Sequence, residues 1–157
     1  MKILLAVDGS SFSAAAAAEV ASRPWPPSSE VKVVTAYQVP MTTTPEVWAT
    51  SDEYYPALEK IAREQAQAIV DATLPSLGGG FETSLRITGE VLTGPACEAI
   101  LEKADAWQAD LIVMGSHGYG AWRRLFLGSV SQAVVSHAKC SVEIVHQRQE
   151  SDGIRAA

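Results

Sequence analysis

Five stretches of the chain carry the hydrophobic pattern of β-strands. Residues 2–7 are predicted to form the first strand. After Lys2 they are all apolar, and the run ends at Asp8, a pattern typical of a strand buried on both faces of a sheet. From Phe81 to Ile87 apolar and polar residues alternate, so this strand is expected to be half exposed at a sheet edge. The strands are predicted at residues 2–7, 31–39, 81–87, 109–114 and 142–146.

Helical patterns occupy four of the segments between these strands. Ala14–Ala21 is rich in alanine, the best helix former, and Ser10 or Ser11 can cap its start. A second helix is predicted at residues 55–74, a third at 95–107 with Pro95 in the first helical position, and a fourth at 129–137. In the second helix, the face expected to pack on the sheet consists of Leu58, Ile61, Ala62, Gln65, Ile69 and Ala72. Residues 40–51 lack periodicity and are expected to form a long loop.

Strands and helices alternate along the whole chain, and this order favours an α/β fold with right-handed crossovers. The sequence therefore predicts a single open sheet of five parallel strands in the order 3-2-1-4-5, with helices on both faces. Strands 1 and 4 then lie side by side, and ligands of such sheets bind beyond the carboxyl ends of the strands at this reversal of winding. Asp8 is expected to face the loop that begins at Gly115.

The 157 residues have the composition of one globular domain, with 47% hydrophobic and 19% charged residues. We assign residues 1–147 to this domain and residues 148–157 to a polar tail. The net charge of −6 argues against nucleic acid and membrane surfaces as partners. The first apolar run is too short for a signal peptide, and no segment approaches the roughly 20 apolar residues of a membrane helix. These features predict a soluble, cytoplasmic protein.

Neither the cysteines nor the histidines are spaced for a metal site or a redox motif. Cys97 and Cys140 form no CxxC pair and are expected to be buried, reduced thiols. The three histidines, His117, His137 and His146, form no HxxxH pair, so no structural zinc site is predicted.

The stretch from Gly115 to Ser129, GSHGYGAWRRLFLGS, directly follows the fourth predicted strand. Gly115 and Gly118 bracket a tight turn whose backbone amides can approach an anion that side chains would otherwise block. The alternative interpretation is that the glycines only turn the chain. A glycine-rich loop alone does not decide between them.

A second possible anion site lies at the start of the last helix. Ser129 and Gln132 have the spacing of a capping box, in which each side chain bonds the backbone amide of the other residue. The free amides and the dipole of a helix start attract phosphate, and the hydroxyls of Ser129 and Ser131 add donors.

Charge agrees with this interpretation. Between Leu111 and Val142 the chain has Arg123, Arg124 and Lys139 but no carboxylate. In a chain as acidic as this one, such a segment suits a polyanionic ligand, although solvated arginines remain the simpler alternative.

Several better-known motifs are absent from the sequence. There is no GxxxxGK[ST] loop, and the spacing GxxGxG after the fourth strand is not the dinucleotide fingerprint. Ser116 lies in GSHG and not in the GxSxG elbow of hydrolases.

The spacing of three glycines resembles a known signature. Gly115, Gly118 and the pair Gly128-Ser129 match the Gly-2x-Gly-9x-Gly-(Ser/Thr) motif of the ATP-binding universal stress proteins. The stretches MKILLAVDGS, VLTGPACEAILEKADAWQADLIVMGSHG and LFLGSVSQAVVSHAKCSVEIV are similar to the same family, so the resemblance covers nearly the whole chain. It implies a Rossmann-like fold of the adenine nucleotide alpha hydrolase type and a role as a stress-response regulator that binds ATP, often with Mg or Mn.

The resemblance also implies which residues contact the nucleotide. Asp8 matches an acidic residue near the adenosine, Ala36 matches backbone groups that bond the adenine edge, and the loop after Met114 matches the ribose and phosphate site. The implied binding residues are Ala6, Val7, Asp8, Ala36, Met114, Gly115, Ser116, His117, Gly118, Gly128, Ser129, Val130 and Ser131. His117 is expected at the rim and not as a catalytic base, and Trp122 and Phe126 are expected to cover the loop.

Other possibilities stay open at this point. Asp8 can instead cap the first helix. The phosphate pocket has no obvious carboxylate base, so at most slow ATP hydrolysis is expected. AMP or a cyclic nucleotide can replace ATP as the ligand, or the chain can be a dimeric partner-binding module without nucleotide. Members of the family commonly form homodimers through the last strand, here Val142–His146.

Overall fold

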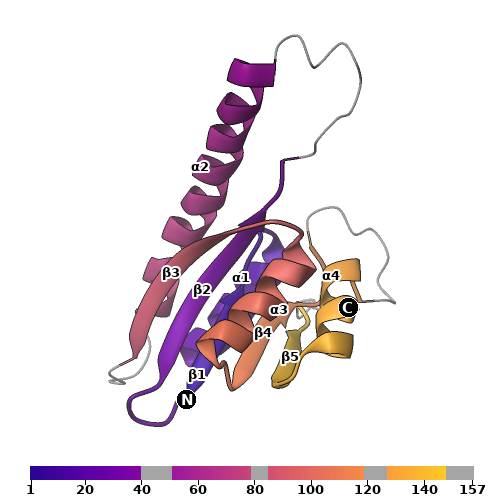
Figure 1. Cartoon of the computed structure of the whole chain (residues 1–157). Helices are drawn as coiled ribbons and strands as arrows, with labels where there is room; N and C mark the ends of the chain where they lie inside the picture. Colours follow the sequence, from indigo (N-terminus) through magenta and orange to yellow (C-terminus); the bar gives the residue numbers. More distant parts are fainter. Residues whose placement is uncertain (40–50, 79–84, 119–126, 148–157) are drawn as a thin grey trace, which may run out of the picture.

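A computed structural model describes residues 1–39, 51–78, 85–118 and 127–147, without side-chain detail for residues 51–54. The elements alternate along the chain in the predicted order (Figure 1). The strands are β1 (Lys2–Ala6), β2 (Glu30–Tyr37), β3 (Arg86–Thr93), β4 (Leu111–Gly115) and β5 (Ser141–Val145). The helices are α1 (Ser11–Ser22), α2 (Ser51–Leu77), α3 (Ala96–Trp107) and α4 (Ser129–His137).

All pairs of neighbouring strands are parallel, and their order is β3-β2-β1-β4-β5. The predicted fold class is therefore confirmed. Ile3 of β1 lies opposite Val31 of β2 on one side and Leu111 of β4 on the other. This register puts β1 and β4 side by side in the middle of the sheet, where the direction of winding reverses.

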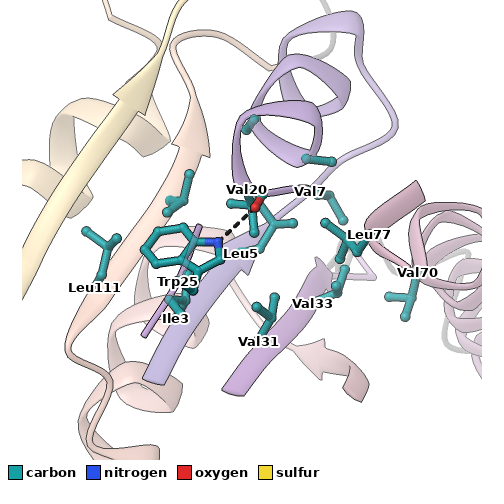
Figure 2. Close-up of a cluster of buried hydrophobic side chains, with 13 residues drawn as sticks. Ile3, Leu5, Val7, Val20, Trp25, Val31, Val33, Val70, Leu77 and Leu111 are labelled. Atoms are coloured by element: carbon teal, nitrogen blue, oxygen red, sulfur yellow. Dashed lines mark hydrogen bonds between the residues drawn. The ribbon is translucent and has the colours of Figure 1, made fainter. Parts of the chain in front are cut away.

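Two hydrophobic layers cover the sheet because β1 presents alternate residues to opposite faces. Ile3 and Leu5 pack against α1 and α2, and Leu4 packs against α3 and α4. On the first face the indole Nε1 of Trp25 donates a hydrogen bond of 2.8 Å to the carbonyl of Val20, which satisfies its polar atom within the core (Figure 2). The central strands are thus held rigidly from both sides.

The first helix begins as expected, with Ser10 as its N-cap. The Ser10 side chain accepts a hydrogen bond of 3.2 Å from the amide of Ser13. Pro95 is also a cap and not the first helical residue, because the amide of Ala99 donates to the Pro95 carbonyl in the first bond of α3. Either position suits proline, since neither needs its missing amide.

Helix α2 differs from the prediction in its length and in its buried face. It begins at Ser51, and its first turns extend beyond the ends of the strands (Figure 1). Its buried residues are Ala66, Val70 and Leu77, whereas Ile61, Gln65 and Ala72 of the predicted face are exposed. The reason lies in β3: Val70 packs so closely on Gly89 that any Cβ there would collide with it.

Strand β3 is an edge strand as predicted, but it lies further along the chain than the alternating pattern indicated. It runs over Arg86–Thr93, and residues 81–84 of the predicted strand lie outside the described residues. Leu92 is buried under α3, whereas Arg86 and Thr88 are exposed. Residues 40–50 of the loop predicted at 40–51 also lie outside the described residues, and Ser51 is the first residue of α2. The tail from residue 148 lies outside them as well.

Candidate functional site

A cavity of about 530 Å³ lies beyond the carboxyl ends of β1 and β4. The starts of α1, α3 and α4 contribute to its walls, so residues far apart in the sequence meet there. The cavity is lined by all the predicted binding residues except Ser116, namely Ala6, Val7, Asp8, Ala36, Met114, Gly115, His117, Gly118, Gly128, Ser129, Val130 and Ser131. This volume lies within the range of small-molecule sites.

One wall of the cavity is apolar. Val34 and Ala36 come from β2, Ala96 and Ile100 from the first turns of α3, and Met114 from β4. Ile100 and Met114 are buried, so their positions are fixed by the core beneath them. Such a wall suits a flat, weakly polar group such as a nucleobase.

Four of the lining residues were not among the predicted ones: Ser13, Val34, Ala96 and Ile100. Val34 lies two residues before Ala36 on the same face of β2, so the period of a strand would have found it. Ala96 and Ile100 share one face of α3 at the i, i+4 spacing. A helix that starts beside the carboxyl edge of the sheet turns this face toward the cavity.

Asp8 and Gly118 both line the cavity and lie directly against each other. The carboxylate Oδ1 of Asp8 accepts a hydrogen bond of 3.0 Å from the amide of Ser10. Its Oδ2 lies 2.8 Å from the position that a Cβ of Gly118 would occupy. Because Ser10 is the cap of α1, the alternative in which Asp8 caps this helix is wrong. The missing side chain at Gly118 lets the loop after β4 reach the carboxylate.

Gly115 is required for a different reason. A Cβ at this position would lie 2.7 Å from the Phe12 carbonyl carbon and 2.8 Å from its carbonyl oxygen. Both are backbone atoms in the first turn of α1, and they cannot move aside without shifting the helix. Gly115 therefore lets β4 and α1 pack together at the edge of the cavity.

The capping box predicted at the start of α4 is wrong. Gly128 is the N-cap, and no side chain caps the helix. The amide of Gln132 donates to the Gly128 carbonyl, as in any first helical bond. The amides of Ser129, Val130 and Ser131 precede this bond, and the described residues offer them no acceptor. The helix thus presents free donors to the cavity, as expected, but without the predicted side-chain cap.

The two serine hydroxyls of α4 differ in their environment. Ser129 is exposed at the mouth of the cavity. Ser131 is buried, and its hydroxyl donates toward the carbonyls of Ser116 at 3.0 Å and of Gly128 at 2.9 Å. Ser116 is buried behind the cavity wall, where its amide donates to the Val145 carbonyl of β5. Neither Ser116 nor the Ser131 proton is therefore available to a ligand in this arrangement.

His117 lies between the glycines of the loop and is half buried. Its ring centroid is 5.1 Å from that of Phe12, and its Nδ1 lies 3.1 Å from the Ser116 hydroxyl oxygen. Its Nε2 is enclosed and has no partner among the described residues.

Charged groups at the cavity are few among the described residues. Asp8 contributes the one carboxylate of the lining. Lys139, which was counted with the positive segment, pairs with Asp105 of α3 at 2.5 Å and not with the cavity. Arg123, Arg124, Trp122 and Phe126 lie outside the described residues.

The described part of the chain contains no metal cluster and no disulfide. No group of three or more His, Cys, Asp or Glu side chains gathers there in a way that would hold a metal ion. Cys97 and Cys140 are free and half buried, and burial raises the pKa of the Cys140 thiol. Within the same described ranges, no helix combines the length and the apolar character that crossing a membrane requires.

Comparisons with known proteins agree with this architecture. The sequence model of the universal stress protein family matches residues 1–146. The "Universal stress protein in QAH/OAS sulfhydrylase 3'region" of Thermus aquaticus is 36% identical over 143 residues, which cover 91% of this chain and 96% of the relative.

Two crystal structures share the fold and contain nucleotides. A universal stress protein in complex with cAMP is 24% identical with a TM-score of 0.62, covering 94% of this chain and 98% of its own. A family protein from Arabidopsis thaliana with AMP bound is 16% identical with a TM-score of 0.61, covering 97% of both chains. At these identities the likeness concerns the fold.

Proposed function

The chain belongs to the universal stress protein family, and from this premise we propose that its cavity binds an adenine nucleotide through which the protein senses or regulates a stress response. ATP is the proposed ligand, with AMP and a cyclic nucleotide as the alternatives. One observation carries the proposal: Gly115, Gly118 and the free amides at the start of α4 all line the same cavity.

The order of the strands supports one orientation of the nucleotide. The apolar wall lies on the side of β2 and α3, and the free amides of α4 lie on the opposite side, beyond β4. A base against the apolar wall and phosphates at α4 match these environments. Asp8, at the end of β1 between them, is then the proposed acceptor for ribose hydroxyls.

Phosphate binding in this proposal depends on backbone groups. The N-terminus of α4 carries a partial positive charge, and the amides of Ser129, Val130 and Ser131 point away from the helix body. The exposed Ser129 hydroxyl adds a further donor. In this proposal the backbone amides of the loop after β4 and of the start of α4 donate to the phosphates, where a P-loop also uses a lysine.

A divalent ion, Mg or Mn, is proposed to accompany ATP. Mg²⁺ is commonly held by substrate phosphates, retained waters and one or two carboxylates. Asp8 is the one carboxylate of the described lining, so the phosphate oxygens would supply most of the ligands. The ion would offset charge between phosphates and is not assigned a preformed protein site.

Rapid ATP hydrolysis does not fit the proposal. It needs a base or a positioning group for water beside the last phosphate, and Asp8 is assigned to the ribose. We therefore propose a binding protein with a turnover slower than about 1 s⁻¹, the lower end of the usual range for enzymes.

The proposed assembly is a homodimer through the outer edge of β5. Among the described residues this strand pairs only with β4, so its other edge offers backbone groups to a second chain. Continuous pairing of two copies of β5 would cover these edges in both subunits.

Equilibrium dialysis tests the proposed ligand. Labelled ATP, AMP and cAMP are each offered at up to millimolar concentration, with and without Mg²⁺. Saturable binding of at least one nucleotide at one site per chain is expected. No binding of any of the three would reject the nucleotide site and favour the partner-binding module.

A further inference from the structure

We propose that Ser131 is a positioning residue of the cavity: its hydroxyl fastens the loop after β4 to the start of α4 and does not itself bind phosphate. The inference deepens the proposed function, and its consequence for binding rests on it. It assigns different roles to Ser129 and Ser131, which lie two positions apart on α4.

The evidence centres on the carbonyl oxygen of Ser116. This oxygen accepts a hydrogen bond of 2.8 Å from the amide of Gly128 and lies 3.0 Å from the Ser131 hydroxyl oxygen. A carbonyl oxygen has two lone pairs, so it can accept from both of these donors. The loop after β4 and the N-cap of α4 are thereby joined at one atom.

The Ser131 hydroxyl has one proton, and two protein carbonyls compete for it. Besides the Ser116 carbonyl, the Gly128 carbonyl lies 2.9 Å from the same hydroxyl oxygen. An ionised phosphate oxygen accepts hydrogen bonds but donates none. Ser131 therefore cannot donate to phosphate without withdrawing its one proton from these carbonyls, and its 3% exposed fraction leaves it little contact with a ligand.

The hydrogen bonds that join the Ser116 carbonyl to Gly128 and Ser131, called the clasp below, leave room for a Cβ at the N-cap. A Cβ on Gly128 would lie 3.4 Å from the Ser131 hydroxyl oxygen and 3.5 Å from the Ser116 carbonyl oxygen. Both are ordinary van der Waals distances, so the clasp does not itself require glycine at this position. While the hydrogen bonds of the clasp hold, the amides at the start of α4 and in residues 116–118 keep one arrangement. This lowers the entropic cost of ordering them when a ligand binds.

Ser129 is the matched control because it lies in the same helical turn without these contacts. Its side chain is exposed at the cavity, and no hydrogen bond of its hydroxyl is found among the described residues. If phosphate is held at α4, Ser129 is the hydroxyl that can reach it. Ser129→Ala and Ser131→Ala should therefore fail in different ways.

Hydrogen exchange of the nucleotide-free protein tests the clasp without any ligand. In Ser131→Ala the amide of Gly128 should exchange about tenfold faster, as expected for the loss of one buried hydrogen bond. The amide of Ser116, which is bonded to Val145 in the sheet, should keep its protection. In Ser129→Ala both amides should exchange as in the parent protein. Unchanged Gly128 exchange in Ser131→Ala, or equal loss at both amides, would overturn the proposal.

Binding of AMP and adenosine gives the second readout. Ser131→Ala should weaken both ligands by a similar factor of about three to ten, because the fixed arrangement of residues 116–118 against the start of α4 is lost. Ser129→Ala should weaken AMP about tenfold and leave adenosine unchanged, since the lost group contacts phosphate. A loss confined to AMP in Ser131→Ala would make Ser131 a direct phosphate ligand and contradict the proposal. If neither ligand binds the parent protein, the proposed function fails, while the exchange experiment still decides the clasp.

Discussion

The carboxylate of Asp8 and the backbone of Gly118 fit together so closely that a side chain on Gly118 would displace the carboxylate, with 2.8 Å between Oδ2 and the position of a Cβ. The two residues are separated by most of the chain but meet where β1 and β4 end. The sequence around either residue does not by itself explain why a carboxylate stands at one position and a glycine at the other. The contact is therefore a direct consequence of the strand order.

Gly118→Val should weaken nucleotide binding with little effect on folding. The new side chain would push against Asp8 and move the loop away from the ligand, which should lower the affinity about tenfold or more. Gly118 is exposed and its φ is not positive, so the free energy of unfolding should change by about 0.5 kcal/mol or less. Calorimetric titration with AMP and urea unfolding of the same sample measure both quantities. Unchanged affinity would contradict the assigned role of the loop.

Gly115→Ala, in contrast to Gly118→Val, should lower the free energy of unfolding. Its Cβ would meet backbone atoms of Phe12, which cannot move independently of α1. Overpacking of this kind costs about 1–3 kcal/mol in the free energy of unfolding. Urea unfolding compared with Gly118→Val separates the two glycines. A Gly115→Ala protein as stable as the parent would show that the close contact with α1 is not maintained.

The ion pair between β5 and the end of α1 should give the stability a specific dependence on pH. Two hydrogen bonds of 2.7 and 2.8 Å from the Arg23 guanidinium lower the pKa of the Glu143 carboxyl, against a smaller opposing effect of burial. A carboxyl with a lowered pKa in the folded state stabilises the fold above its unfolded pKa. This contribution is lost as the pH falls through the folded pKa.

Glu143→Gln should therefore lower the free energy of unfolding at pH 7 by about 0.5–1 kcal/mol, a modest value because both side chains are partly exposed. The difference from the parent should persist down to about pH 5 and shrink below the ordinary glutamate pKa of about 4.3. Urea unfolding over this pH range measures it. Glu64→Gln is the control, because Glu64 pairs with Lys60 at 3.9 Å on an exposed helix face and should have no measurable effect. A Glu143→Gln difference that does not depend on pH would refute the ion-pair explanation.

The proposed dimer can be tested through the backbone of β5. The Val145 carbonyl faces β4, since it accepts the amide of Ser116, so the neighbouring amide of Ile144 faces the open edge. Proline is tolerated on an edge strand where the missing amide points outward. The parent protein should sediment at twice its chain mass of 16.7 kDa, and Ile144→Pro should shift it to the single-chain mass. A parent that stays at the single-chain mass at high concentration would rule out this dimer.

The sequence was sufficient to predict the strand order because the period of the strands and the alternation of elements leave few topologies. It placed Asp8 and the loop after Gly115 at one edge of the sheet for the same reason, whereas the full set of candidate binding residues came from the resemblance to the family. It failed for the capping box at Ser129, since a local motif cannot reveal that Gly128 is already fixed by the distant Ser116 carbonyl. It also failed for the buried face of α2, which depends on a space at Gly89 in another strand. Both failures concern contacts between segments that only the folded chain brings together.

The most direct measurement is an NMR titration of ¹⁵N-labelled protein with AMP, ATP and adenosine. The amides of Gly118, Ser129 and Val130 should shift strongly with AMP and ATP, because their N–H groups gain phosphate acceptors, and less with adenosine. Amides of the same chain far from the cavity, such as that of Asp110 at the opposite end of β4, should not move. If a nucleotide binds and the amides of Gly118, Ser129 and Val130 stay unshifted, the phosphate is not held by these backbone groups and the account is wrong.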